Sequence, residues 1–178
     1  MGRQSTIRSV ALAAALLTST AAFADNLVLY TSQPDADAAE TVDAFKAANP
    51  GVEVEIFRSG TSDLMTKLAA EFAAGSPQPD VLLIADAVSM ETLKKDGHLM
   101  AYPEANVDGF EEAAYDAEKT YFGSKLITTG IAYNTAAAEK PEHWSDLTGE
   151  AYKDLTIMPS PLYSGAAAYL LSAFVNRD

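Results

Sequence analysis

Small polar residues follow each of three apolar runs in the sequence, at the point where a helix pattern begins. These residues are Thr31, Ser32, Arg58, Ser59, Gly60, Thr61, Ala85 and Asp86. Hydroxyl groups and the free N–H groups of a helix start suit oxyanions, and an arginine can bind a phosphate through two hydrogen bonds. If the three runs are neighbouring parallel strands, their ends meet at the sheet edge where open α/β sheets bind ligands. The pattern therefore indicates a site for a small anionic solute.

Helix capping is the competing explanation, because Ser, Thr and Asp are favoured at helix starts in any protein. Capping is the commoner role for a single hydroxyl, and Asp86 is interpreted as an N-cap. The joint arrangement reverses this preference for Ser59, Gly60 and Thr61, although Gly60 also suits an ordinary turn. For Arg58, a ligand contact and a solvated strand end both stay open.

A second polar loop precedes the last helix pattern, at residues 166–175. Its residues Ser160, Tyr163, Ser164 and Gly165 are expected on the opposite side of the same cleft. Tyr163 suits stacking on a solute or closing over it, and it equally suits ordinary aromatic packing.

Alternating strands and helices would position these residues. Apolar runs at 27–30, 52–56 and 81–84 predict strands, and helical periodicity predicts helices after Ser32, at 64–72 and at 87–95. This order predicts an α/β fold, with a doubly wound parallel sheet of order 2-1-3. Glutamates alternate along the second strand and place it at an edge, whereas the fully apolar third strand is expected to be central.

Later in the chain the patterns are weaker. We expect Ser32 to cap the first helix. We also expect a short helix at 110–117, a bent strand at 125–133 and a short strand at 155–158, before the final helix.

Composition limits the class of protein. The 178 residues carry a formal net charge of −13 and contain no cysteine, which argues against nucleic-acid binding and excludes thiol chemistry. Residues 1–24 have the features of a cleaved signal peptide, with an apolar core at 10–17 and Ala22-Phe23-Ala24 before the cut. The mature chain is expected to begin at Asp25 and to be periplasmic.

Several segments resemble those of one protein family in order and spacing. They are Leu29–Ser32, Phe57–Thr61, Pro79–Leu82, Ile131–Asn134, Pro141–Leu147, Tyr152-Lys153 and Ser164-Gly165. The chain resembles an extracytoplasmic solute-binding protein of an ABC importer, from the branch associated with iron(III), phosphonates and phosphorylated solutes. The resemblance implies a periplasmic-binding-protein-like fold of type 2, with a solute clamped between two lobes. It also implies a permease partner in the inner membrane, a monomer, and neither a cofactor nor a catalytic residue.

The same resemblance suggests how the chain is divided. Residues 25–127 would form the first lobe, without its C-terminal return. Residues 128–178 would form the crossover and the start of a second α/β lobe, so the chain is expected to be truncated.

A ferric receptor is the alternative function. Iron-binding relatives carry His or Tyr after the first strand, often a Glu after the third, and a tyrosine pair later. Here the first two of these loops offer only Asp86, and the region of the tyrosine pair would lie beyond Asp178. His98 and His143 are isolated and are interpreted as surface or packing residues, and Trp144 is expected to anchor the second lobe. A secreted enzyme is the third alternative, and the sequence contains no nucleophile elbow, P-loop or His-Glu-x-x-His motif that would support it.

Overall fold

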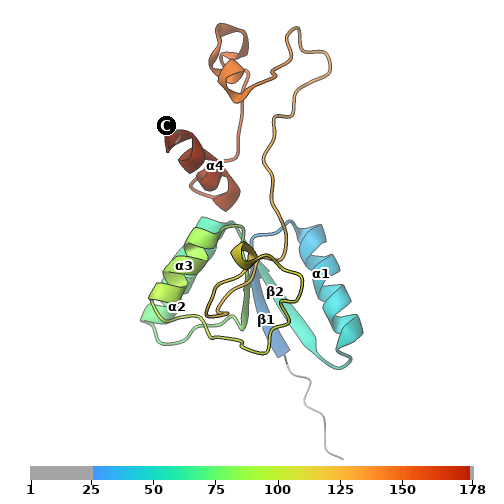
Figure 1. Cartoon of the computed structure of the whole chain (residues 1–178), viewed down its shortest axis with the longest axis vertical. Coiled ribbons are helices and arrows are strands. Elements are labelled where there is room, and N and C mark those ends of the chain that lie inside the picture. The colour runs from blue at the N-terminus through green and yellow to red at the C-terminus, as the bar shows by residue number, and fades with distance from the viewer. Residues whose placement is uncertain (1–25, 177–178) are drawn as a thin grey trace, which may run out of the picture.

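The computed structural model describes residues 26–176 (Figure 1). The expected signal peptide and the expected mature start at Asp25 lie outside the described residues. The strands are β1 (Asn26–Thr31), β2 (Glu53–Arg58) and β3 (Val81–Leu83). The α-helices are α1 (Asp35–Ala48), α2 (Thr61–Ala73), α3 (Ala87–Lys95) and α4 (Gly165–Val175), and the short 3-10 helices are η1 (Glu112–Ala114), η2 (Trp144–Thr148) and η3 (Glu150–Tyr152).

β1 is the middle strand of a parallel sheet of order β2-β1-β3, which confirms the predicted order 2-1-3. The register pairs Thr31 with both Arg58 and Leu83, so the carboxyl ends of all three strands lie at one level. Within residues 26–176, β3 pairs with β1 alone. The expectation of a central third strand is therefore not met in this part of the chain, and Val81 is 47% exposed.

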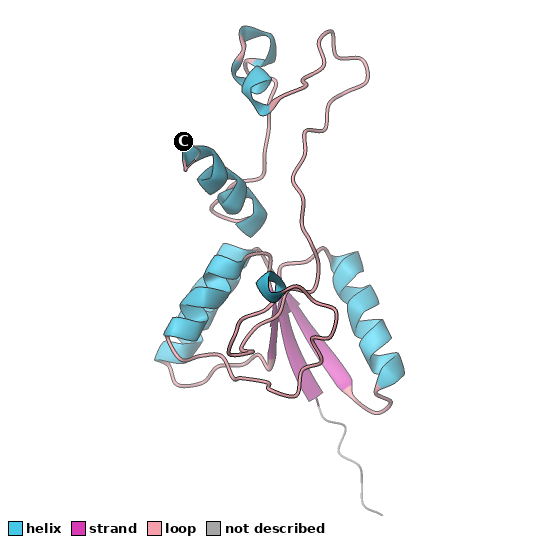
Figure 2. Cartoon of the chain, in the orientation of Figure 1, coloured by secondary structure: helices cyan, strands magenta, loops and turns pink. Residues whose placement is uncertain are grey.

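Helices cover both faces of the sheet. α1 lies on one face, and α2 and α3 lie on the other (Figure 2). This arrangement confirms the doubly wound α/β class. Each parallel connection runs through a helix because parallel neighbours cannot be joined by a tight turn.

The core lies between β1 and the α2–α3 pair. Its buried members are Tyr30, Leu64, Leu68 and Leu93. Leu64 and Leu68 occur one helical turn apart on α2 and are fully buried, which is the face that the helical spacing in the sequence predicts.

A polar network crosses this core at Tyr30. The Tyr30 hydroxyl donates to Glu71 Oε1 at 2.8 Å, and Lys67 Nζ lies 2.6 Å from the same oxygen. Burial and the bond to Glu71 raise the pKa of Tyr30. Burial by itself would raise the pKa of Glu71, but hydrogen bonds from Lys67 and Tyr30 lower it overall. The network therefore keeps Glu71 charged beneath the sheet.

Residues 99–123 form an irregular loop that one carboxylate anchors to α3. Asp116 is buried, accepts from Lys94 Nζ at 2.6 Å and accepts from Thr120 Oγ1 at 2.6 Å. These bonds, with that from Lys94 first, lower the pKa of Asp116 to about 2. The expected helix at 110–117 is reduced to η1, because Tyr115 is extended and bridges Phe122.

The chain after residue 123 contains helices but no strand up to residue 176. The prediction of strands at 125–133 and 155–158 is therefore wrong. An extended segment is stable as a strand only when a neighbour completes its hydrogen bonds, and neither segment has one there. Together with α4 these segments instead line an apolar cavity of about 1070 Å³.

Trp144 in η2 contacts α4 in this second part of the chain. The Trp144 and Phe174 rings meet edge to face, with centroids 5.4 Å apart, and both line the apolar cavity. This contact agrees with the expected anchoring role of Trp144. No helix in residues 26–176 is both long and apolar enough to cross a membrane.

Replacing Leu64 by Ala should lower the free energy of unfolding by about 2–5 kcal/mol, because it leaves a cavity at a fully buried position. Urea denaturation followed by circular dichroism would measure the change. Leu126→Ala is the matched control, since Leu126 is 91% exposed. Equal losses in the two variants would contradict the proposed core.

Asp116→Asn should remove part of the acid sensitivity of the fold. The pKa of Asp116 is about 2 in the folded chain, and an unfolded aspartate titrates near 4. The folded state therefore gains stability from this group above about pH 4 and loses it as the pH falls from about 4 to about 2. Urea midpoints measured across this window should fall less steeply for Asp116→Asn than for the parent, whereas the exposed control Asp108→Asn should keep the parent slope.

Candidate functional site

The ends of the three strands are tied together by one short hydrogen-bonded set. The Leu83 carbonyl accepts from Thr31 Oγ1 at 2.9 Å and from the Ser32 N–H at 3.1 Å, and Ser59 N–H donates to the Thr31 carbonyl at 3.2 Å. Thr31 is fully buried, and its hydroxyl also accepts from Gln33 N–H. Thr31 therefore holds the three loops in fixed positions at the sheet edge.

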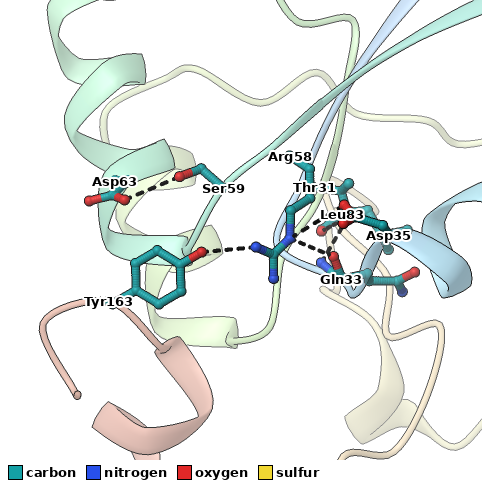
Figure 3. Close-up of polar contacts among 8 residues, drawn as sticks. All are labelled: Thr31, Gln33, Asp35, Arg58, Ser59, Asp63, Leu83 and Tyr163. Atoms are coloured by element: carbon teal, nitrogen blue, oxygen red, sulfur yellow. Dashed lines mark hydrogen bonds and ion pairs between the residues drawn. The ribbon is translucent and has the colours of Figure 1, made fainter. Parts of the chain in front are cut away.

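Arg58 crosses this edge and joins three segments (Figure 3). Its Nε donates to the Gln33 carbonyl at 3.0 Å and lies 4.0 Å from Asp35 Oδ1. Its Nη1 donates to the Tyr163 hydroxyl at 2.9 Å. No hydrogen bond within residues 26–176 involves Nη2 of this guanidinium, so Arg58 retains donors for a further acceptor.

Two of the helix starts at this edge are capped by side chains. Asp86 Oδ1 accepts from Ser89 N–H at 2.7 Å and its Oδ2 accepts from the Ser89 hydroxyl at 3.0 Å, which confirms that Asp86 is an N-cap. Ser164 Oγ accepts from Ala167 N–H at 3.3 Å and caps α4. The backbone of Ala85 leads from β3 into the Asp86 cap.

The starts of α1 and α2 lack such caps. α1 begins after Pro34, so the prediction that Ser32 caps it is wrong: Ser32 N–H is used at the sheet edge, two residues too early. α2 begins after Gly60 with no side-chain cap. The nearby Ser59 hydroxyl donates to Asp63 Oδ2 at 3.1 Å instead. The first N–H groups of α2 are therefore left without a capping oxygen, at the positive end of the helix dipole.

The loop before α4 is folded into a tight turn by Ser160. The Ser160 carbonyl accepts from Tyr163 N–H at 3.0 Å and from Ser164 N–H at 2.9 Å, and Ser160 Oγ accepts from Leu162 N–H at 3.2 Å. Ser160 thus serves the turn, which directs Tyr163 toward the first part of the chain.

Two glycines, Gly60 at the sheet edge and Gly165 directly after this loop, allow the loop and the edge to lie in contact. A Cβ atom at Gly60 would contact the Tyr163 carbonyl and lie 2.6 Å from Cδ2 of the Tyr163 ring. A Cβ atom at Gly165 would lie 2.8 Å from Thr61 Oγ1 and 3.0 Å from Asp86 Oδ2. Only glycine permits this approach at both positions, so the two sides of the site touch backbone to side chain.

Three buried side-chain oxygens at this edge have no hydrogen-bond partner among the described residues. They are Ser32 Oγ, Gln33 Oε1 and Thr61 Oγ1. Thr61 is the clearest case, because it is only 3% exposed and lies under Gly165 at the start of α2. Burying a hydroxyl without a partner costs about 1–3 kcal/mol, and such groups are concentrated at functional sites.

The structure brings the two predicted sets of residues together, one from each side of this contact. The side chains of five predicted residues form hydrogen bonds within the protein: Thr31, Ser59, Asp86, Ser160 and Ser164. Arg58, Ser32 and Thr61 keep polar atoms without a hydrogen-bond partner among residues 26–176. A contact with solute stays a prediction for all of these residues. Gln33 was not singled out from the sequence, although its position directly after the first strand-end pair was an available signal.

Metal-binding groups do not gather here. Within residues 26–176, no three His, Cys, Asp or Glu side chains lie close enough to hold one ion. His98 stacks on Phe72, with ring centroids 3.6 Å apart, at the end of α2 far from the strand ends. A cavity of about 440 Å³ between α2 and α3 lies at that same remote end.

Comparison with known proteins gives the family. Residues 30–178 match the family of bacterial extracellular solute-binding proteins. The chain is also 28% identical over 158 residues to the probable ABC transporter periplasmic-binding protein y4fP of Sinorhizobium fredii, which covers 87% of this chain and 43% of that relative. It thus spans less than half of the length of the curated relative that it matches. With most of the chain matched, this protein belongs to the bacterial extracellular solute-binding protein family.

Proposed function

We propose that this chain belongs to the periplasmic receptor of an ABC importer, and that its solute is a small anion such as a phosphonate or an organic phosphate. One observation carries the proposal: the free donors of Arg58 and the buried, unpartnered hydroxyl of Thr61 lie at the uncapped start of α2. A fixed cation, a hydroxyl donor and a row of backbone N–H groups are the groups that bind oxyanions in proteins.

Nearby carboxylates restrict the charge of the solute. Asp35 lies beside Arg58, and Asp63 lies in the first turn of α2, where it already interacts with the helix dipole. These groups offset much of the positive potential of the edge. The site therefore favours a solute with one compact anionic group over a multiply charged one.

Delivery to a membrane permease follows from the family and from the two-sided site. Residues 25–127 would form one lobe, and residues 128–178 the crossover and the start of the other, in a monomer cleaved after Ala24. The loop Ser160–Gly165 would then be the part of the second lobe that faces the solute. Affinity would come from donors already aimed at the solute and from closure of the lobes.

Ferric binding and catalysis have less support. Both Asp86 oxygens accept hydrogen bonds from Ser89, and no group of three His, Cys, Asp or Glu side chains that could hold an ion lies within residues 26–176. The hydroxyls of Ser59 and Ser164 hydrogen-bond within their own helix starts.

A panel of phosphonates, sugar phosphates and ferric chelates in titration calorimetry on the full-length protein tests the proposal. Binding of ferric ion without a response to any oxyanion would overturn it.

Arg58→Gln should weaken anion binding by about 10- to 100-fold, because it removes the cation whose free donors are assigned to the anion. Titration calorimetry with the best oxyanion of the panel would measure the loss. Lys153→Gln removes the same charge from an exposed side chain directly after η3, and should leave the affinity unchanged. A similar loss in both variants would mean that only net charge matters.

Thr61→Val should separate binding from stability. The variant keeps the shape of the side chain but removes a donor, so the affinity for the oxyanion should fall about 10-fold. The free energy of unfolding should stay the same or rise, because a buried hydroxyl without a partner is replaced by a methyl group. Thr66→Val is the matched control on the exposed side of α2, where the hydroxyl donates to the Ser62 carbonyl. A marked loss of stability in Thr61→Val with unchanged affinity would contradict the assignment.

A further inference from the structure

Tyr163 occupies the part of the site that a solute would need. Its hydroxyl accepts from Arg58 Nη1 at 2.9 Å, and its ring and carbonyl lie against Gly60, at the uncapped start of α2. One residue of the facing loop therefore binds one nitrogen of the cation (Figure 3) and also lies against the helix start, the two groups assigned to the anion.

The same loop covers Thr61 without satisfying it. Gly165 lies over Thr61 Oγ1, which belongs to a residue only 3% exposed and has no hydrogen-bond partner within residues 26–176. The closed contact is therefore incomplete in its hydrogen bonding, and its stability is lowered by the unpaired group.

The chemistry of Tyr163 makes it a weak competitor rather than a permanent partner. A phenol oxygen is a neutral, single acceptor, whereas an oxyanion accepts several charge-assisted bonds that are about twice as strong as neutral ones. An anion that accepts from Nη1 of Arg58 as well as from its free Nη2 can therefore displace Tyr163 from the guanidinium.

We infer that Tyr163 determines affinity as an internal competitor: its hydroxyl holds Arg58 and keeps the Ser160–Gly165 loop closed on the sheet edge until an anion takes its place. The inference rests on the proposed function, because the competing solute must be an anion that binds Arg58. The apparent dissociation constant then equals the intrinsic one divided by the fraction of molecules in which the loop has released the edge.

Tyr163→Phe tests the competition, because it keeps the ring and removes only the acceptor. In the full-length protein, inorganic phosphate and methylphosphonate should bind about 3- to 10-fold more tightly to Tyr163→Phe than to the parent in titration calorimetry. Tyr169→Phe, which removes an exposed hydroxyl from α4, should leave both affinities unchanged. Unchanged or weaker binding in Tyr163→Phe would overturn the inference, and weaker binding would make Tyr163 a direct contact of the solute.

Hydrogen exchange separates this inference from the proposed function, because it needs no solute. Amide exchange of residues 160–167 should be faster in Tyr163→Phe, and also in Gly60→Ala, whose added Cβ atom clashes with the Tyr163 ring. Gly130→Ala is the control, because a Cβ atom there meets no neighbour within 4 Å. If exchange is faster in both test variants but neither anion binds to any variant, the contact between Tyr163 and the sheet edge would still be supported. The anionic solute and the competition for Arg58 would then both be overturned. Unchanged exchange in both test variants would overturn the inference alone.

Discussion

The parallel register of β1 is the constraint on which the rest of the structure depends. Because Thr31 pairs with both Arg58 and Leu83, three loops that are far apart in sequence start from the same level of the sheet. The buried Thr31 hydroxyl then bonds to Leu83 and Gln33 and fixes the spacing of these loops. A shift of one residue in either pairing would turn Arg58 or Leu83 to the opposite face. The position of Arg58, the last residue of β2, is therefore set by the register of the sheet.

The well-packed core and the proposed anion site lie at different ends of helix α2. Leu64, Leu68 and the Tyr30–Glu71 pair stabilise the packing of α2 on β1, and Asp116 ties the irregular loop to α3. The start of the same helix α2 carries a buried hydroxyl without a partner and N–H groups without a cap. The well-packed end of the helix thus holds in place the end that is left poorly satisfied, as proteins commonly do at binding sites.

The two sides of the site are in contact at two glycines, Gly60 and Gly165. Gly60 and Gly165 allow the backbone of one side to approach the side chains of the other at van der Waals distance. This close approach makes the arrangement sensitive to one methyl group added at either glycine.

The sequence alone predicted the three-stranded parallel sheet and part of the chemistry at its edge. Apolar strands alternating with amphipathic helices predicted the 2-1-3 order, and the position of Asp86 directly before a helix pattern predicted its role as an N-cap. It failed for residues 125–133 and 155–158, because an apolar run becomes a strand only when a neighbouring strand accepts its hydrogen bonds, and that neighbour is not a local property. The hydrogen bond from Arg58 to Tyr163 joins residues 105 positions apart in the sequence, and the contact of Tyr163 with Gly60 depends on the same long-range packing. Only the tertiary structure decided these contacts, since they follow from where the sheet edge and the loop before α4 lie in space.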